Sequence, residues 1–189
     1  MYLKIKNGFA DSEFYFLKKF LKMIDTELTE LNIKIKKSND PESDGLYDFA
    51  EHFIGHGFIA IQRYFASTYP QTNIKKIDAL RVEPRITDNQ FLAEVLNAAA
   101  NYAKHEGEWK ILFHPYEEGK ETILKNPEKK TLDIIMGITA YAEYTLSNLL
   151  AEILKRTNTS KDLLLSPLLP LIEKWRYNLD LQYDSNDNT

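Results

Sequence analysis

The chain of 189 residues has the length of one domain of ordinary size. Its 24 lysine and arginine residues are outnumbered by 28 aspartate and glutamate residues, and the net charge of −4 makes nucleic acid an unlikely partner. The lack of cysteine excludes disulfides, thiolate metal sites and a cysteine nucleophile. Because no apolar run is long enough to span a bilayer, we predict a soluble, cytoplasmic protein that does not enter a membrane.

Hydrophobic periodicity predicts two long helices in the first third of the chain. Apolar side chains alternate at spacings of three and four from Phe14 to Ile35, which indicates a helix over 11–36. Turn-forming residues fill 38–45, and a second amphipathic helix is expected over 46–67. These two helices are therefore joined by a short loop.

The middle of the chain is predicted to hold a short helix or strand followed by a third helix. The connection 71–85 carries only a few apolar residues, whereas 88–105 has a continuous apolar face with Thr87 or Asp88 as the N-cap. Three consecutive alanines, 98–100, make this helix slim. One interpretation is that they face the two glycines of the second helix, because small residues allow close packing; a local kink at those glycines is the alternative.

The last third of the chain begins with an irregular connection over 106–130. The alternation of three and four returns after it and predicts one continuous helix over 131–155. A last helix is expected to begin with Ser166 as N-cap and Pro167 in the first turn. The leucine-rich segment 163–171 either closes one end of the protein or forms a homodimer patch.

These elements predict an all-α fold, arranged as a mostly antiparallel bundle of four to five helices with one long irregular connection. A single helical domain over 1–183 accounts for all the periodic segments. The remaining residues, 184–189, have no apolar anchor and are predicted to form a flexible C-terminal tail. A small appended hairpin is compatible with this arrangement.

Two histidines four residues apart, His52 and His56, lie one helical turn from each other and could share a divalent metal ion. Asp48 continues the same row, and His105 could add a ligand from another helix. Phe53 stands where zincin peptidases carry their glutamate base, so that chemistry is not supported. On a helical wheel the row lies far from the apolar face, which favours an exposed polar surface. We therefore expect no cofactor, with a divalent metal as the alternative.

Four further residues are candidates for a polar surface or a ligand site: Arg63, Asn97, Asn101 and Trp109. The two asparagines and His105 are spaced by four residues, so they form a row that could position a water molecule or a ligand. The alternative is an exposed polar face whose histidine interacts with the helix C-terminus.

No complete catalytic motif is present, because the chain lacks a phosphate-binding loop, a dinucleotide fingerprint, a nucleophile elbow and a calcium loop. We therefore predict a noncatalytic binding or protein-interaction module with a protein partner or self-association. One alternative is a divalent-metal-dependent, hydrolase-like enzyme that uses His52 and His56. The other is an RNA-directed toxin, defence or regulatory protein, which only the compact helical class suggests.

Overall fold

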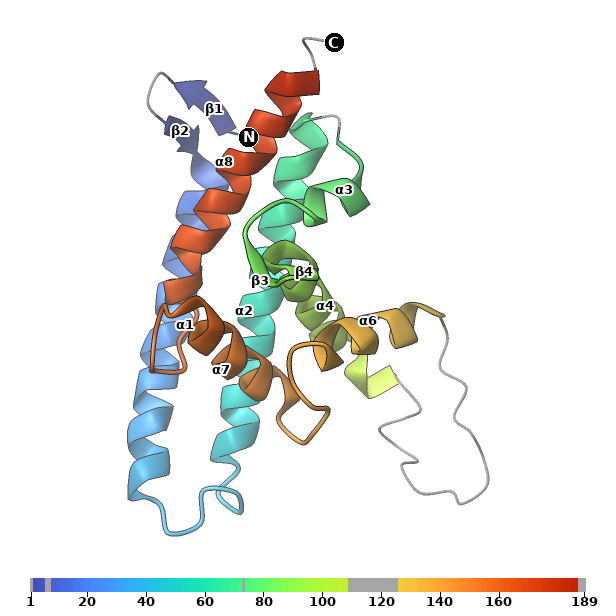
Figure 1. The fold of residues 1–189 in the computed structure, drawn as a ribbon. Coiled ribbons are helices and arrows are strands. Elements are labelled where there is room, and N and C mark those ends of the chain that lie inside the picture. Colours follow the sequence, from blue (N-terminus) through green and yellow to red (C-terminus); the bar gives the residue numbers. More distant parts are fainter. Residues whose placement is uncertain (1, 6–7, 73, 109–125, 187–189) are drawn as a thin grey trace.

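A computed structural model describes residues 2–5, 8–72, 74–108 and 126–186, and its architecture is almost entirely helical (Figure 1). This confirms the predicted all-α class. Among the described residues no helix is long and apolar enough to cross a bilayer. The described part contains seven α-helices: α1 (Ser12–Lys37), α2 (Leu46–Thr68), α3 (Lys76–Leu80), α4 (Leu92–His105), α6 (Asn126–Met136), α7 (Thr145–Thr157) and α8 (Leu169–Asn186).

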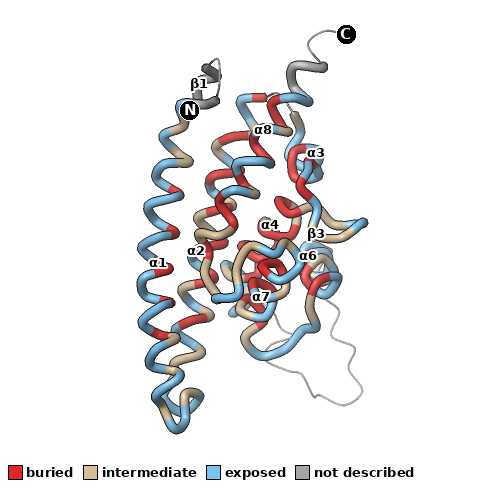
Figure 2. The backbone as a smooth tube through the Cα atoms, turned by 60° about the vertical axis from the view of Figure 1, so that its left-hand side comes forward, coloured by how far each residue is buried: buried red, intermediate tan, exposed pale blue. Residues whose placement is uncertain are grey.

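Helices α1 and α2 confirm the two predicted long helices and run antiparallel beside each other (Figure 1). The carboxylate of Asp11 accepts a hydrogen bond from the backbone N–H of Phe14 at 2.9 Å and so caps α1. Gly45 precedes α2 with a φ of +66°, a conformation that favours glycine. Helix α1 stands at the edge of the molecule, with buried residues along one side only (Figure 2).

The described strands form two small antiparallel hairpins. β1 (Tyr2–Ile5) pairs with β2 (Gly8–Asp11) just before α1, and β3 (Arg85–Thr87) pairs with β4 (Gln90–Phe91) just before α4. The second hairpin corrects the predicted start of the third helix. Its strands take the residues expected to hold the N-cap and first turn, and α4 begins at Leu92 without a side-chain cap.

The continuous helix predicted over 131–155 is wrong, because residues 137–144 separate α6 from α7. Helix α6 ends at Met136, just before Gly137. The side chain of Gln90 packs so closely against Gly137 that a Cβ on this residue would overlap it. That approach lets Gln90 Nε2 donate a hydrogen bond to the carbonyl oxygen of Ile134 at 2.7 Å. Helix α7 then restarts after Tyr144, which adopts a left-handed conformation. The apolar alternation thus continues across a turn by coincidence.

Helix α8 follows a single 3-10 turn at Ser166–Leu168, with Pro167 inside that turn as predicted. The cap is not Ser166, because the Asp25 carboxylate of α1 accepts the N–H groups of Leu165 and Ser166 at 2.7 and 2.9 Å. Leu165, Leu168 and Leu169 are buried, so the leucine-rich segment closes part of the protein core. Helix α8 continues to Asn186, and the end of the predicted tail lies outside the described residues.

Buried aromatic rings join α8 to α2 in the core. The Trp175 ring lies 4.5 Å from that of Phe65 and 6.3 Å from that of Tyr64. Its indole N–H donates to the carbonyl oxygen of Ala79 at 2.8 Å, which satisfies the one polar atom of a fully buried side chain. This contact also fixes α3 against the core.

The two glycines of α2 face different neighbours, which corrects part of the expected pairing. A Cβ on Gly55 would lie 3.2 Å from the Cβ of Ala103, so this glycine does lie close to α4, although one turn beyond the alanine run. Gly57 instead faces the side chain of Leu165, ahead of α8. Close packing is thus needed at both positions, but against two separate parts of the chain.

Candidate functional site

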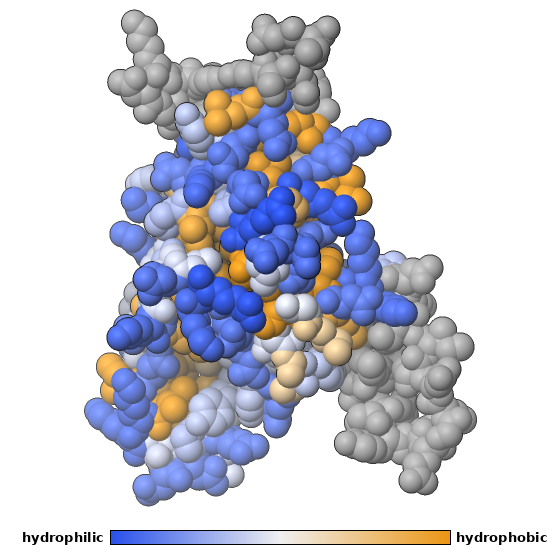
Figure 3. Space-filling model, viewed as in Figure 1, coloured by the Kyte–Doolittle hydropathy of each residue, from blue (hydrophilic) through white to orange (hydrophobic). Residues whose placement is uncertain are grey.

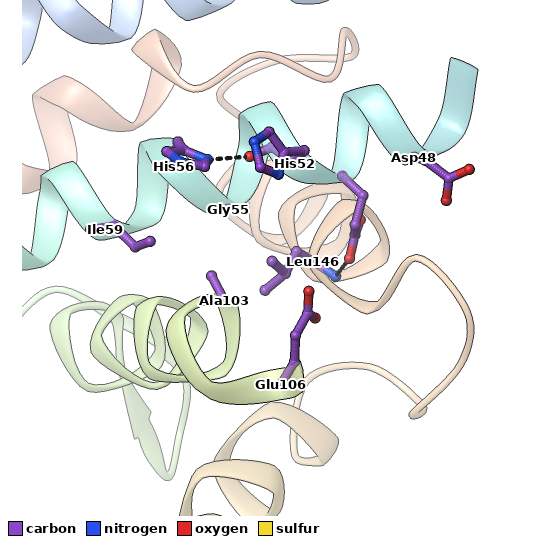
Figure 4. A pocket seen from close by; sticks show the side chains of 9 residues that line it. Asp48, His52, Gly55, His56, Ile59, Ala103, Glu106 and Leu146 are labelled. Atoms are coloured by element: carbon purple, nitrogen blue, oxygen red, sulfur yellow. Dashed lines mark hydrogen bonds between the residues drawn. The ribbon is translucent and has the colours of Figure 1, made fainter. Parts of the chain in front are cut away.

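The predicted histidine row lies on the exposed side of α2. The ring centroids of His52 and His56 are 4.3 Å apart, and Nδ1 of His56 lies 2.9 Å from the backbone carbonyl oxygen of His52 (Figure 4). Because a carbonyl oxygen can only accept, Nδ1 of His56 is the donor in this contact. Both side chains are exposed, as the helical wheel predicts.

A hollow of about 220 Å³ lies beside this row, between α2, α4 and the start of α7. Glu51 of α2 lines it, but its carboxylate accepts the N–H groups of Leu146 and Ser147 at 2.6 and 2.8 Å. The Ser147 hydroxyl donates to the same carboxylate at 2.6 Å. Glu51 therefore caps α7, where a negative charge is favoured by the helix dipole.

Glu106 is the second glutamate of this hollow and comes from the end of α4 (Figure 4). Partial burial, together with the negative charge of Glu51, raises the pKa of its carboxyl group above the usual range. The hollow is therefore acidic, with two imidazoles along its rim. Sequence reasoning missed both glutamates, since neither lies in a motif.

The four candidate metal ligands are not brought together. Asp48 lines the hollow, but Figure 4 shows its side chain pointing away from the imidazoles. His105 lies 3.4 Å from Glu108 on the exposed end of α4 and does not line the hollow. Within the described part of the chain, no group of three or more histidine, aspartate or glutamate side chains is arranged to hold a metal ion.

Asn97 and Asn101 belong to a different surface, where α4 faces α2 on one side and α6 on the other. Gln62 Nε2 donates to Oδ1 of Asn97 at 3.0 Å and to Oδ1 of Asn101 at 2.8 Å. Lys104 Nζ donates to Gln62 Oε1 at 2.7 Å. Both asparagines line a second hollow, of about 320 Å³, between α3, α4 and α6. The predicted row thus exists, but Gln62 and Lys104 complete it in place of His105.

Arg63 lies at the edge of a third hollow, of about 480 Å³, in the groove between α1 and α2. The lining of this groove is mainly apolar, with Phe16 and Phe20 from α1 and Ile59 and Ala60 from α2. Neither aromatic residue lies on the apolar alternation of α1, and Phe16 is 62% exposed and Phe20 is 37% exposed. Their exposure could have been predicted from the sequence, because both residues lie at the edge of the apolar face of α1 on a helical wheel.

Trp109, the last candidate residue, lies outside the described residues. Comparison with known proteins adds no constraint, because no family model matches the chain and neither the curated proteins nor the solved structures give a significant match. The choice among the three hollows therefore depends on their geometry and charge.

Proposed function

We propose that this protein is a noncatalytic interaction module that pairs with a second copy of itself through the face formed by α1 and α2. The observation that carries this proposal is an apolar ridge lying beside an apolar hollow on one surface. The ridge consists of Phe16, Phe20 and Met23 on α1, and the hollow is the groove between α1 and α2. Exposed apolar surface of this kind is stabilised when another surface covers it.

The ridge has the spacing expected of a helix that inserts into a groove. Its members stand at positions i, i+4 and i+7, which places them on one side of α1. Phe16 and Met23 are 62% and 59% exposed, so they protrude from the surface. Ile59 and the small Ala60 leave room beside them on α2. Ridge and hollow are thus both apolar, and Phe16 and Phe20 of the ridge also form the α1 wall of the hollow.

A second copy is the favoured occupant because a two-fold interface needs both complementary features on the same patch. A two-fold axis parallel to the groove places α1 of each copy over α2 of its partner. Since α1 and α2 are antiparallel, every neighbouring pair in the resulting four-helix arrangement is antiparallel as well. The ridge of each copy then fills the hollow of the other.

The charges beside the groove fit the same arrangement. Glu13 and Arg63 both line the groove, from α1 and α2 respectively, and neither has an ion-pair partner among the described residues. The rings of Phe14 and Tyr64, whose centroids are 5.5 Å apart, place the two charges at the same level. The two-fold axis therefore brings Glu13 of one copy over Arg63 of the other, twice per dimer.

The available area is also sufficient. Helices of 26 and 23 residues are about 35 Å long, and a face two helices wide offers about 700 Å² per copy. A standard protein interface buries about 600–1,000 Å² per partner, a range that includes this value. The face shown in Figure 3, with α8 in front, is mostly hydrophilic and carries its hydrophobic residues in small, separate groups.

Sedimentation equilibrium with exchanged charges tests this proposal. The wild-type protein is expected to have the mass of a dimer, and Glu13→Arg or Arg63→Glu alone should raise the dissociation constant about 3- to 10-fold, because each creates two like-charge pairs. The double variant Glu13→Arg/Arg63→Glu restores the pairs in reverse and should recover the wild-type constant. A monomeric wild type, or a double variant weaker than both single variants, contradicts the proposal.

A substitution in the ridge tests the apolar part of the same interface. Phe16→Ser should raise the dissociation constant at least about 10-fold, since an aromatic anchor is lost from each copy. Tyr177→Ser is the matched control, because this aromatic residue is 55% exposed on α8, away from the groove. Equal effects of the two substitutions would remove the α1–α2 face from consideration.

A further inference from the structure

The hollow between α3, α4 and α6 combines a polar end with an apolar wall. Asn97 and Asn101 of α4 line it, together with Lys76 of α3 and Lys130 of α6. Ile77, Leu80 and Ile134 provide apolar surface in the same hollow. Its volume of about 320 Å³ lies at the small end of the range for ligand sites. The size suits a small molecule with one charged group.

A directional series of hydrogen bonds sets the orientation of the two asparagines. Lys104 Nζ donates to Gln62 Oε1, and Gln62 Nε2 donates in turn to Oδ1 of Asn97 and of Asn101. Both side-chain oxygens are thereby engaged as acceptors. Their Nδ2 groups make no hydrogen bond to the part of the chain that the structure describes, although both residues line the hollow. The Nδ2 groups of the two amides are therefore hydrogen-bond donors that remain available to a ligand.

The charges around the hollow are positive in a protein whose net charge is −4. Lys76 and Lys130 have no ion-pair partner among the described residues. The acidic residue of the lining, Glu94, is paired with Arg81 at 3.2 Å. Partial burial and, to a smaller extent, the positive charge of Lys76 lower the pKa of Lys104. A bound anion would relieve their mutual repulsion.

We propose that this hollow binds a small phosphate monoester, with its phosphate group between Lys76 and Lys130 and its apolar group against Ile77 and Leu80. A dianionic head matches two separate lysines, which act as point charges toward phosphate. A carboxylate is the poorer match, because bidentate recognition of carboxylate uses arginine and Arg81 is engaged by Glu94. The proposal is independent of the α1–α2 interface, since no residue that lines this hollow lies on α1 or α2.

Titration with phenyl phosphate, followed by ¹H–¹⁵N NMR spectroscopy, tests this site. We expect saturable shifts of the Asn97 and Asn101 side-chain amide signals, with binding at least about 10-fold tighter than that of benzoate or inorganic phosphate. Asn101→Asp keeps the oxygen that Gln62 requires but replaces the donor by a negative charge, so it should weaken binding at least about 10-fold. Lys76→Met and Lys130→Met should each weaken it about 3- to 10-fold.

Lys161→Met is the matched control, because this exposed lysine precedes the 3-10 turn before α8 and lies outside the hollow. It should leave the phenyl phosphate affinity unchanged. The proposal is overturned if phenyl phosphate shifts no signal of this hollow, if benzoate binds as tightly, or if Asn101→Asp and both lysine variants bind like the wild type. The backbone NMR spectra of the exposed-lysine variants should match that of the wild type, which shows that weaker binding is not caused by unfolding.

Discussion

Asp11 shows how much of this fold depends on a single side chain. Its Oδ1 accepts the Phe14 N–H, whereas its Oδ2 accepts the Tyr64 hydroxyl at 2.8 Å and Arg176 Nη1 at 2.5 Å. The side chains of Asp11 and Arg176 are each only 4% exposed. One carboxylate thus links the start of α1 to both α2 and α8, with its charge compensated inside the core.

Removing the charge of Asp11 should therefore destabilise the protein strongly. Asp11→Asn keeps the shape but removes the negative charge that pairs with the buried guanidinium of Arg176, and we expect the free energy of unfolding to fall by about 3 kcal/mol. Urea denaturation followed by circular dichroism measures this change. Glu173→Gln is the control, because Glu173 is 60% exposed and lies 3.8 Å from the same guanidinium. A loss below about 1 kcal/mol for Asp11→Asn would argue against this role.

The stability of the protein should depend on the ionisation of Glu106, and replacing this residue should stabilise the protein, whereas replacing Asp11 destabilises it. Its pKa is raised in the folded protein, so its contribution to stability is fully present below the ordinary value of 4.5 and is lost as the pH rises through the folded pKa. Glu106→Gln should then stabilise the protein at neutral pH, by only a few tenths of a kcal/mol because solvent screens this half-buried group. Thermal melts of both proteins should differ at pH 7 and coincide near about pH 3.5. A destabilised variant at pH 7 would contradict the expected repulsion from Glu51.

The exposure of individual residues could be predicted only where helical geometry decides it. The wheel of α2 correctly places His52 and His56 on the outer side, since their angles follow from the spacing alone. The partners of Asn97 and Asn101 could not be found in the same way. Gln62 lies 35 residues before Asn97, and nothing in the local sequence connects them.

Two helices of this protein are capped by carboxylates from distant parts of the chain. Glu51 caps α7 from 95 residues away, and Asp25 binds the N–H groups ahead of α8 from 140 residues away. Local capping rules therefore locate these helix starts only approximately. The same limit explains the missed break after α6, where Gln90 packs against Gly137 and a tertiary contact overrides the apolar period.

The packing of Gly57 against Leu165 gives a prediction at the level of helix packing. Gly57→Ala should lower the free energy of unfolding by about 1–3 kcal/mol, because its Cβ would overlap the Leu165 side chain and this strain outweighs the gain in helix propensity. In a Leu165→Ala background the obstruction is gone, and the same substitution should stabilise the protein by up to about 1 kcal/mol. Chemical denaturation of the four proteins completes a double-mutant cycle. Additive effects would show that the two positions do not interact.

At the scale of the whole molecule, the α1–α2 face is distinguished by where α1 lies. Helix α8 and the 3-10 turn before it hold α1 along one side through Asp11 and Asp25, and this leaves the ridge of Phe16, Phe20 and Met23 uncovered. The all-α class was predictable from apolar periodicity. The uncovered face was not, because periodicity shows which residues share a side of a helix but not whether a neighbour covers that side.

A spin-label distance measurement across the α1–α2 face tests self-association most directly. The chain contains no cysteine, so Thr26→Cys provides a single labelling position on α1, at an exposed residue outside the ridge and the groove. In a four-helix arrangement with helices 8–10 Å apart, the two labels of a dimer should lie within about 30 Å and give one distance distribution, which Phe16→Ser should abolish. The absence of any short distance between labels, under conditions where the wild-type protein should be dimeric, would contradict the proposed interface.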